Sequence, residues 1–158
     1  MALTADMVGM HFRYPDHYMV EREKVREYAV AVQNHDGAFF EEKTAAELGY
    51  QGLLAPLTFI SVFGYKAQSA FFEHANIAVN DAQIVQVDQV LKFLKPIQDG
   101  DKLYCDVSVD SVRQAHGTDI IVTKNIITND AGDVVQETYT TLAGRSGDGE
   151  EGFSHATA

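Results

Sequence analysis

The chain has 158 residues, 46% of them hydrophobic, and a formal net charge of −11. A chain of this length is expected to fold as one domain that buries about 70% of the surface its unfolded form exposes. The acidic charge and the scattered Lys and Arg residues argue against nucleic acid or an anionic membrane as a partner. The sequence has neither an apolar run of about 18 residues nor an amino-terminal leader pattern, so the cytoplasm is the expected location.

The amino-terminal part predicts a short extended segment over residues 18–20 and an amphipathic helix over residues 21–32. In the helix, apolar residues recur at helical spacing: Val25, Tyr28, Ala29 and Val32. Turn formers follow at residues 33–37, where Gly37 can adopt a positive φ, and Phe39 and Phe40 are expected in a loop. A second short helix is predicted over residues 43–48, closed by Gly49.

The longest helix is predicted over residues 56–74. Pro56 suits the first helical position, because its φ is already fixed near the helical value and its missing N–H would be unpaired there. Apolar side chains surround much of the circumference: Phe59, Ile60, Val62, Phe63, Ala67, Ala70, Phe71 and Phe72. This pattern is typical of a helix buried on most sides.

Four β-strands are predicted after this helix, over residues 83–93, 102–112, 119–128 and 134–143, because β-branched and alternating runs recur there. Short turns rich in Gly, Asn and Asp separate the strands and favour antiparallel neighbours. One long apolar helix followed by such a meander indicates an α+β fold in which the sheet wraps the helix, as in the hotdog arrangement. The domain is expected to span residues 1–145.

Residues 146–158 form an acidic, glycine-rich tail with almost nothing to bury, so this tail is expected to be disordered. Cys105 is the only cysteine and lies in an alternating apolar run, so we expect it to pack in the core. A lone cysteine allows neither a disulfide within the chain nor a cysteine-based metal site. The histidines lack metal-ligand spacing, and we predict no metal and no cofactor.

Several sequence blocks resemble the MaoC-like hydratase and dehydratase family. Within that family they are most similar to the A-type subunits of the mycolic-acid (3R)-hydroxyacyl-ACP dehydratase, with the C-type paralogues as the nearest competitor. The similarity runs from residue 1 to about residue 144 and is carried by residues 14–16 (Tyr-Pro-Asp), 55–59 (Ala-Pro-Leu-Thr-Phe), 83–89 (Gln-Ile-Val-Gln-Val-Asp-Gln) and 137–142 (Glu-Thr-Tyr-Thr-Thr-Leu).

The resemblance implies a single hotdog fold that pairs into a double hotdog. It also implies a type II fatty-acid synthase enzyme that removes water from a long 3-hydroxyacyl chain carried by an acyl-carrier protein. The enzyme would work as a heterodimer with a catalytic B-type hotdog subunit. Because the acidic chain would repel an acidic carrier protein, a basic partner subunit is expected.

Of the residues that perform the dehydration in catalytic relatives, only the aspartate has a counterpart here, Asp36. Those relatives carry an Asp-x-Asn-Pro-x-His motif, whose carboxylate and imidazole move the protons of the elimination. Counting from Asp36, the Asn, Pro and His positions fall on Ala38, Phe39 and Glu41. The Ala-His-Gly sequence of their helix entrance is replaced at residues 55–57, where the proline removes a backbone donor. The resemblance therefore implies no catalytic residue in this chain and a dyad supplied by the partner.

The predicted function of this chain is to bind the acyl chain. Each methylene removed from water contributes about 0.8 kcal/mol, so a long acyl chain needs a long apolar groove. The candidate substrate-binding residues are Phe59, Ser61, Tyr65, Gln68, Gln86 and Phe93. The alternative is that the aromatic residues only fill the core. Lys92, Lys95 and Lys102 are candidates for contacting the phosphopantetheine phosphate or the carrier protein, or form an ordinary solvated edge.

Two other functions stay open. In one, the chain is a self-sufficient homodimeric enoyl hydratase or thioesterase that uses Asp36 or Glu41 as acid and base. In the other, it is a non-enzymatic acyl-binding scaffold. A homodimer of the isolated chain is compatible with each reading, and activity of the purified chain separates them.

Overall fold

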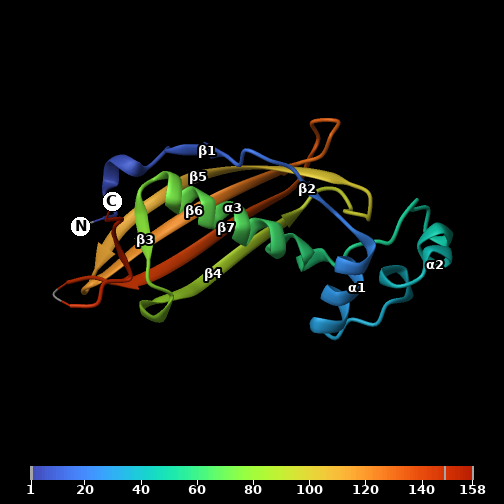
Figure 1. Cartoon of the computed structure of the whole chain (residues 1–158), viewed down its shortest axis with the longest axis horizontal. Coiled ribbons are helices and arrows are strands. Elements are labelled where there is room, and N and C mark those ends of the chain that lie inside the picture. Colours follow the sequence, from blue (N-terminus) through green and yellow to red (C-terminus); the bar gives the residue numbers. More distant parts are fainter. Residues whose placement is uncertain (1, 148, 158) are drawn as a thin grey trace.

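A six-stranded antiparallel sheet and one long helix, α3 (Ile60–His74), dominate this computed structural model, which describes residues 2–147 and 149–157 (Figure 1). The strand order is β1-β5-β6-β7-β4, and β2 pairs with β5 beside this path. The four long strands are β4 (Ile84–Phe93), β5 (Lys102–Ala115), β6 (Thr118–Thr128) and β7 (Val134–Arg145). The predicted α+β fold, with an antiparallel sheet wrapped around a central helix, is confirmed.

The shorter elements lie before α3 and at the ends of the sheet. Helices α1 (Arg22–Ala31) and α2 (Glu42–Glu47) lie beyond the end of the sheet that is next to the start of α3 (Figure 1). The short strands are β1 (His11–Arg13), β2 (Tyr18–Met19), β3 (Ile77–Val79) and β8 (Phe153–His155), and 3-10 turns occur at Ala5–Met7, Gly37–Phe39, Leu57–Phe59 and Asp81–Gln83. The four predicted long strands and three predicted helices are all present, with ends shifted by a few residues.

The start of the central helix differs from the prediction. Pro56 has φ −54° and ψ 147°, an extended conformation, and it precedes a 3-10 turn at Leu57–Phe59, so it is not the first helical residue. Side chains from other parts of the chain donate hydrogen bonds to two carbonyl groups of this turn. The Tyr28 hydroxyl donates to the Thr58 carbonyl at 2.9 Å, and Gln136 Nε2 donates to the Leu57 carbonyl at 3.1 Å. These contacts hold the entrance in the tighter turn before α3 begins.

The core lies between α3 and the face of the sheet that packs against it. Phe59, in the 3-10 turn before α3, and Phe63 and Phe71 on α3 are 0–1% exposed. Strand β6 alternates between buried and partly buried residues along its whole length, as the sequence pattern predicts for a half-buried strand. Cys105 on β5 is fully buried, which confirms its predicted place in the core. Burial raises the pKa of its thiol to about 12.

The carboxy-terminal tail is not disordered throughout, in contrast to the expectation from sequence. Residues Phe153–His155 form β8, which pairs antiparallel with β3. Phe153 is 0% exposed and its ring centroid lies 5.8 Å from that of Phe72. The tail can pack here because Gly144 leaves space that a Cβ would fill, at 2.6 Å from the Phe153 ring. Met1, Asp148 and Ala158, which fall in the predicted domain and tail, lie outside the described residues.

Neither a membrane span nor a metal cluster is found in the described ranges. No helix there is long and apolar enough to cross a membrane. No group of three or more His, Cys, Asp or Glu side chains in those ranges is arranged to hold a metal ion.

Candidate functional site

A groove lies between α3 and the edge strand β4, and it brings together four of the six predicted substrate-binding residues. Ser61, Tyr65 and Gln68 come from α3 and Gln86 from β4, and all four line a cavity of about 300 Å³, here called the inner cavity. Its remaining lining residues are Ile60, Gly64, Gln89, Asn125, Thr138 and Thr140. The helical spacing of residues 61, 65 and 68 places them on one face of α3, toward the sheet.

The strand side of the inner cavity is polar. Asn125 on β6 and Thr138 on β7 are directly opposite each other in the sheet, and each is 4% exposed. In the next row, Thr123 lies opposite Thr140, and Gln68 Nε2 donates to Thr123 Oγ1 at 2.6 Å. Sequence reasoning missed these strand residues. The available signal was that polar residues take positions 123 and 125, between the inward-facing Ile121 and Ile127.

A β-bulge in β4 completes this polar lining. The register with β7 shifts between Gln86 and Asp88, so that Gln86 pairs with Leu142 and Gln89 with Thr140. In a regular strand, residues 86 and 89 would face opposite sides of the sheet. The bulge turns both glutamine side chains toward α3.

A second cavity, of about 640 Å³, adjoins the first and shares Tyr65, Gln68 and Gln86 with it. We call it the tail-side cavity, because Ala156 and strand β3 form part of its wall. Apolar side chains are prominent among its remaining lining residues: Phe72, Ile77, Val79, Ile84 and Leu142. The groove is therefore polar beside the first half of α3 and richer in apolar side chains beside the second half.

The other two predicted residues, Phe59 and Phe93, lie outside this groove. Phe59 is 1% exposed and packs between the rings of Tyr18 and Tyr28, with centroids at 6.2 and 5.6 Å, so it belongs to the core. Phe93 is 43% exposed and lines a separate cavity of about 290 Å³ at the start of the central helix, here called the entrance cavity.

The entrance cavity is bounded by the segments in which catalytic relatives were expected to carry their motif. Phe39, Pro56 and Leu57 line it, together with Leu94 and Gln136. Its other lining residues are Tyr50, Leu54, Ala55, Phe93, Lys95, Pro96 and Ile97, so neither a carboxylate nor an imidazole faces it among the described residues. Gln136 Oε1 is buried here without a hydrogen-bond partner in the described structure.

The two carboxylates considered as acid and base are exposed and engaged locally. Asp36 caps the 3-10 turn after it, accepting a hydrogen bond from the Ala38 backbone N–H at 2.9 Å. Glu41 Oε2 accepts from Thr44 Oγ1 at 3.2 Å. The loop thus presents no paired acid and base.

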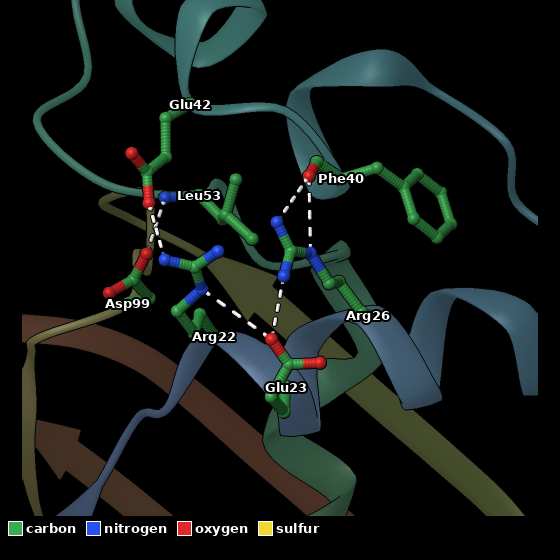
Figure 2. Close-up of polar contacts among 7 residues, drawn as sticks. All are labelled: Arg22, Glu23, Arg26, Phe40, Glu42, Leu53 and Asp99. Atoms are coloured by element: carbon green, nitrogen blue, oxygen red, sulfur yellow. Dashed lines mark hydrogen bonds and ion pairs between the residues drawn. The ribbon is translucent and has the colours of Figure 1, made fainter.

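Arginine side chains hold this loop in place (Figure 2). Arg26 of α1 donates to the Phe40 carbonyl from Nη2 at 2.8 Å and from Nε at 3.1 Å, and it pairs with Glu23 at 2.6 Å. Arg22 pairs with Glu42 at 2.8 Å. Because the bidentate contact of Arg26 fixes the backbone next to Glu41, the loop is positioned by α1.

Two of the three candidate lysines already contact acidic groups of the chain. Lys95 Nζ lies 2.6 Å from Asp133, and Lys92 Nζ lies 3.9 Å from Glu137 and 5.3 Å from the Tyr139 ring centroid. These contacts favour an ordinary solvated edge over a phosphate site.

Comparisons with known proteins agree along nearly the whole chain. A sequence model of the family described as FAS1-like, dehydratase domain region matches residues 6–138. UPF0336 protein Rv0635 of Mycobacterium tuberculosis is 78% identical over 158 residues, with 100% of both chains covered. UPF0336 protein Rv0637 of the same species is 49% identical over 149 residues, which are 94% of this chain and 90% of that protein.

Solved structures show the same fold. A chain of the C-terminally truncated HadBC complex, a (3R)-hydroxyacyl-ACP dehydratase of M. tuberculosis, is 48% identical with a TM-score of 0.81, over 90% of this chain and 100% of that one. R-hydratase PhaJ1 of Pseudomonas aeruginosa, at 15% identity, shares the fold with a TM-score of 0.65 over 96% of this chain and 88% of that one. The fold is the hotdog fold of the MaoC-like dehydratases, and the chain belongs to the family of FAS1-like dehydratase domain regions.

Proposed function

We propose that this chain is the acyl-chain-binding, non-catalytic subunit of a heterodimeric (3R)-hydroxyacyl-ACP dehydratase that acts in type II fatty-acid elongation of mycolic-acid precursors. In the terms used for the solved relative, it is a HadA-type subunit. The family and the 48% identity to a chain of the HadBC dehydratase support the coarser statement, a subunit of a hydroxyacyl dehydratase. The finer statement depends on the site geometry.

The entrance cavity carries this proposal, because neither a carboxylate nor an imidazole lines it among the described residues, where the elimination needs an acid and a base. Removal of water across C2–C3 requires one group to take the C2 proton and another to protonate the departing hydroxyl. Phe39 and Pro56 border the cavity, and Glu41 stands at the position of the motif histidine. Asp36 is occupied as a turn cap. The dyad is therefore supplied by a second subunit.

The exposed edge of β4 supports a paired assembly. This 10-residue strand is hydrogen-bonded to β7 on one side, and its other side has no strand partner in the described part of the chain. Val85, Val87 and Val90 on β4 are 60%, 56% and 44% exposed. A long, apolar, unpaired edge is normally covered in native proteins. A second hotdog chain that joins edge to edge would cover it and form the double hotdog.

The α3–β4 groove supports the acyl-binding role. Its two adjoining cavities extend beside α3 from Ile60 to the wall formed by β3, and the tail-side cavity provides the apolar surface that an alkyl chain needs. The acyl-carrier protein would deliver the chain as its thioester.

Co-expression with a candidate catalytic hotdog subunit tests the proposal. The purified chain alone is expected to show no turnover of crotonyl or 3-hydroxyacyl thioesters, and the co-purified heterodimer is expected to be active. Substituting the motif histidine of the partner should abolish that activity. Asp36→Asn and Glu41→Gln in this chain should leave the rate within about twofold, because neither carboxylate transfers a proton in the proposed reaction.

Two outcomes would contradict the proposal and select an alternative. An enzyme-like rate of the chain alone that is lost in Asp36→Asn or Glu41→Gln would identify a self-sufficient homodimeric hydratase. Acyl binding without any rate gain, when each plausible catalytic subunit is added, would identify a non-enzymatic scaffold.

A further inference from the structure

The interface between α3 and the sheet contains an unusual concentration of buried polar groups. Among the described residues, six polar or charged residues are buried, and all six lie on β6 and β7. Asp119 lies near the first residue of β6, and the other five are Thr123, Asn125, Gln136, Thr138 and Thr140. Four of the five form two adjacent rows of the sheet. Apolar side chains are the normal filling between a helix and a sheet, so a polar patch here needs hydrogen-bond partners.

Most groups in this patch have partners within the chain, but two amide oxygens do not in the described structure: Gln136 Oε1, at the entrance cavity, and Asn125 Oδ1. Gln68 donates to Thr123 at 2.6 Å, and Gln89 donates to Thr140 at 3.4 Å. Asn125 Nδ2 points to the Gly64 carbonyl at 3.5 Å, which places Oδ1 on the other side of the amide. Asn125 Oδ1 is buried without a partner, and Asn125 lines the inner cavity at 4% exposure.

The chemistry of this atom determines what can satisfy it. An amide oxygen only accepts hydrogen bonds, so its partner must be a donor. An alkyl chain offers none, and an unsubstituted acyl chain lying across Asn125 would leave the oxygen both unpaired and desolvated. A ketone or ester oxygen is also an acceptor and is equally unsuitable. A hydroxyl on the chain both donates and remains small enough for the cavity.

We infer that the inner cavity is a subsite for a hydroxyl group on the bound acyl chain, with Asn125 Oδ1 accepting the hydrogen bond from that hydroxyl. This inference rests on the proposed acyl-binding function and assigns the inner cavity a role in discriminating between chains. The tail-side cavity, which shares Tyr65, Gln68 and Gln86 with the inner cavity, receives the alkyl segment beyond the hydroxyl. Asn125 acts in specificity and moves no proton.

Binding of three acids of equal chain length to the full-length chain tests this assignment. The probes are dodecanoic acid, 3-hydroxydodecanoic acid and ω-hydroxydodecanoic acid, each titrated calorimetrically below its micelle concentration. A hydroxylated acid is expected to bind roughly 3- to 10-fold more tightly than dodecanoic acid, the range for one net hydrogen bond. A preference for the 3-hydroxy acid identifies the hydroxyl that the elimination removes, and a preference for the ω-hydroxy acid identifies one farther along the chain.

Variants separate this subsite from a general effect of buried amides. Asn125→Leu should remove the preference while it binds dodecanoic acid at least as tightly as the native chain. Gln136→Met is the matched control, because it removes the other unpartnered amide oxygen, which lines the entrance cavity. The control should keep the preference. Circular dichroism checks that each variant is folded, and the comparison of the three acids on the native chain needs no variant.

Two results would overturn the inference, and they are distinguishable. Equal binding of the three acids by the native chain means that water alone satisfies Asn125, and it leaves the proposed function intact. Failure of every acid to bind overturns both the subsite and the acyl-binding role.

Discussion

Phe153 is expected to be a principal anchor of the carboxy-terminal tail, and Phe153→Ala tests this. The side chain is 0% exposed, packs against Phe72, and fills the space left by Gly144. Truncation of a fully buried phenylalanine to alanine costs about 3–5 kcal/mol of unfolding free energy, from lost burial and the cavity left behind. For a chain of this size, that loss corresponds to a decrease in Tm of roughly 6–20 °C.

Urea unfolding followed by circular dichroism measures the change, with Phe93→Ala as a matched control. Phe93 is 43% exposed, so its truncation in the isolated chain should cost less than about 1.5 kcal/mol. Limited proteolysis should remove the tail of Phe153→Ala under conditions in which the native tail resists. If Phe153→Ala changed the unfolding free energy by less than about 0.5 kcal/mol, as expected for an exposed site, the tail would not be anchored as described.

Three further predictions concern buried groups. Gly144→Ala should destabilise the native chain by about 1–3 kcal/mol, because its Cβ would stand 2.6 Å from the Phe153 ring, and a double-mutant cycle with Phe153→Ala should show that most of this cost disappears with the ring. Burial raises the pKa of the Asp119 carboxyl, so its ionised form weakens the native state. Asp119→Asn keeps an acceptor for Gln114 Nε2 and should therefore raise Tm at pH values above the pKa of the folded carboxyl. This gain in Tm should vanish below about pH 4, where Asp119 is protonated in the unfolded chain as well. An equal gain at acidic and neutral pH would contradict the prediction. Because burial raises the pKa of Cys105 to about 12, iodoacetamide at neutral pH should leave the native protein unmodified by mass spectrometry while it alkylates the urea-unfolded chain.

The long elements were predictable because each contains its own periodic signal. Strand β6 carries the alternation of a half-buried strand, and the apolar residues of α3 surround the helix. Strands β1, β3 and β8 have three residues each, too few for any periodicity, and they exist because of long-range pairing. Phe153 illustrates this, since the space that receives it is created by Gly144 and by strands far away in the sequence.

The candidate site was predictable in part for a related reason. Ser61, Tyr65 and Gln68 share one face of a helix, so their common position follows from sequence spacing. Phe59 belongs to the same predicted helix, although the structure places it in the 3-10 turn before α3. Its sequence position cannot distinguish a core residue from a groove residue when the predicted helix is apolar on most sides. Gln86 and Gln89 face the same cavity only because of the β-bulge, which no pattern in the sequence predicts.

The two halves of the site support the proposal that this hotdog subunit binds the acyl chain while a partner subunit supplies the acid and the base. At the entrance cavity, Glu41 stands at the position of the motif histidine and Pro56 lacks a backbone donor, so no single substitution at Glu41 is expected to restore turnover. In the groove, Asn125 Oδ1 is buried without a hydrogen-bond partner in the described structure, and we infer that a hydroxylated acyl chain supplies the donor. In an active heterodimer, Asn125→Leu should therefore lower kcat/KM for 3-hydroxyacyl thioesters, whereas Asp36→Asn should leave it within about twofold. Equal effects of both substitutions on every substrate would mean that recognition and chemistry are not divided between the subunits in this way.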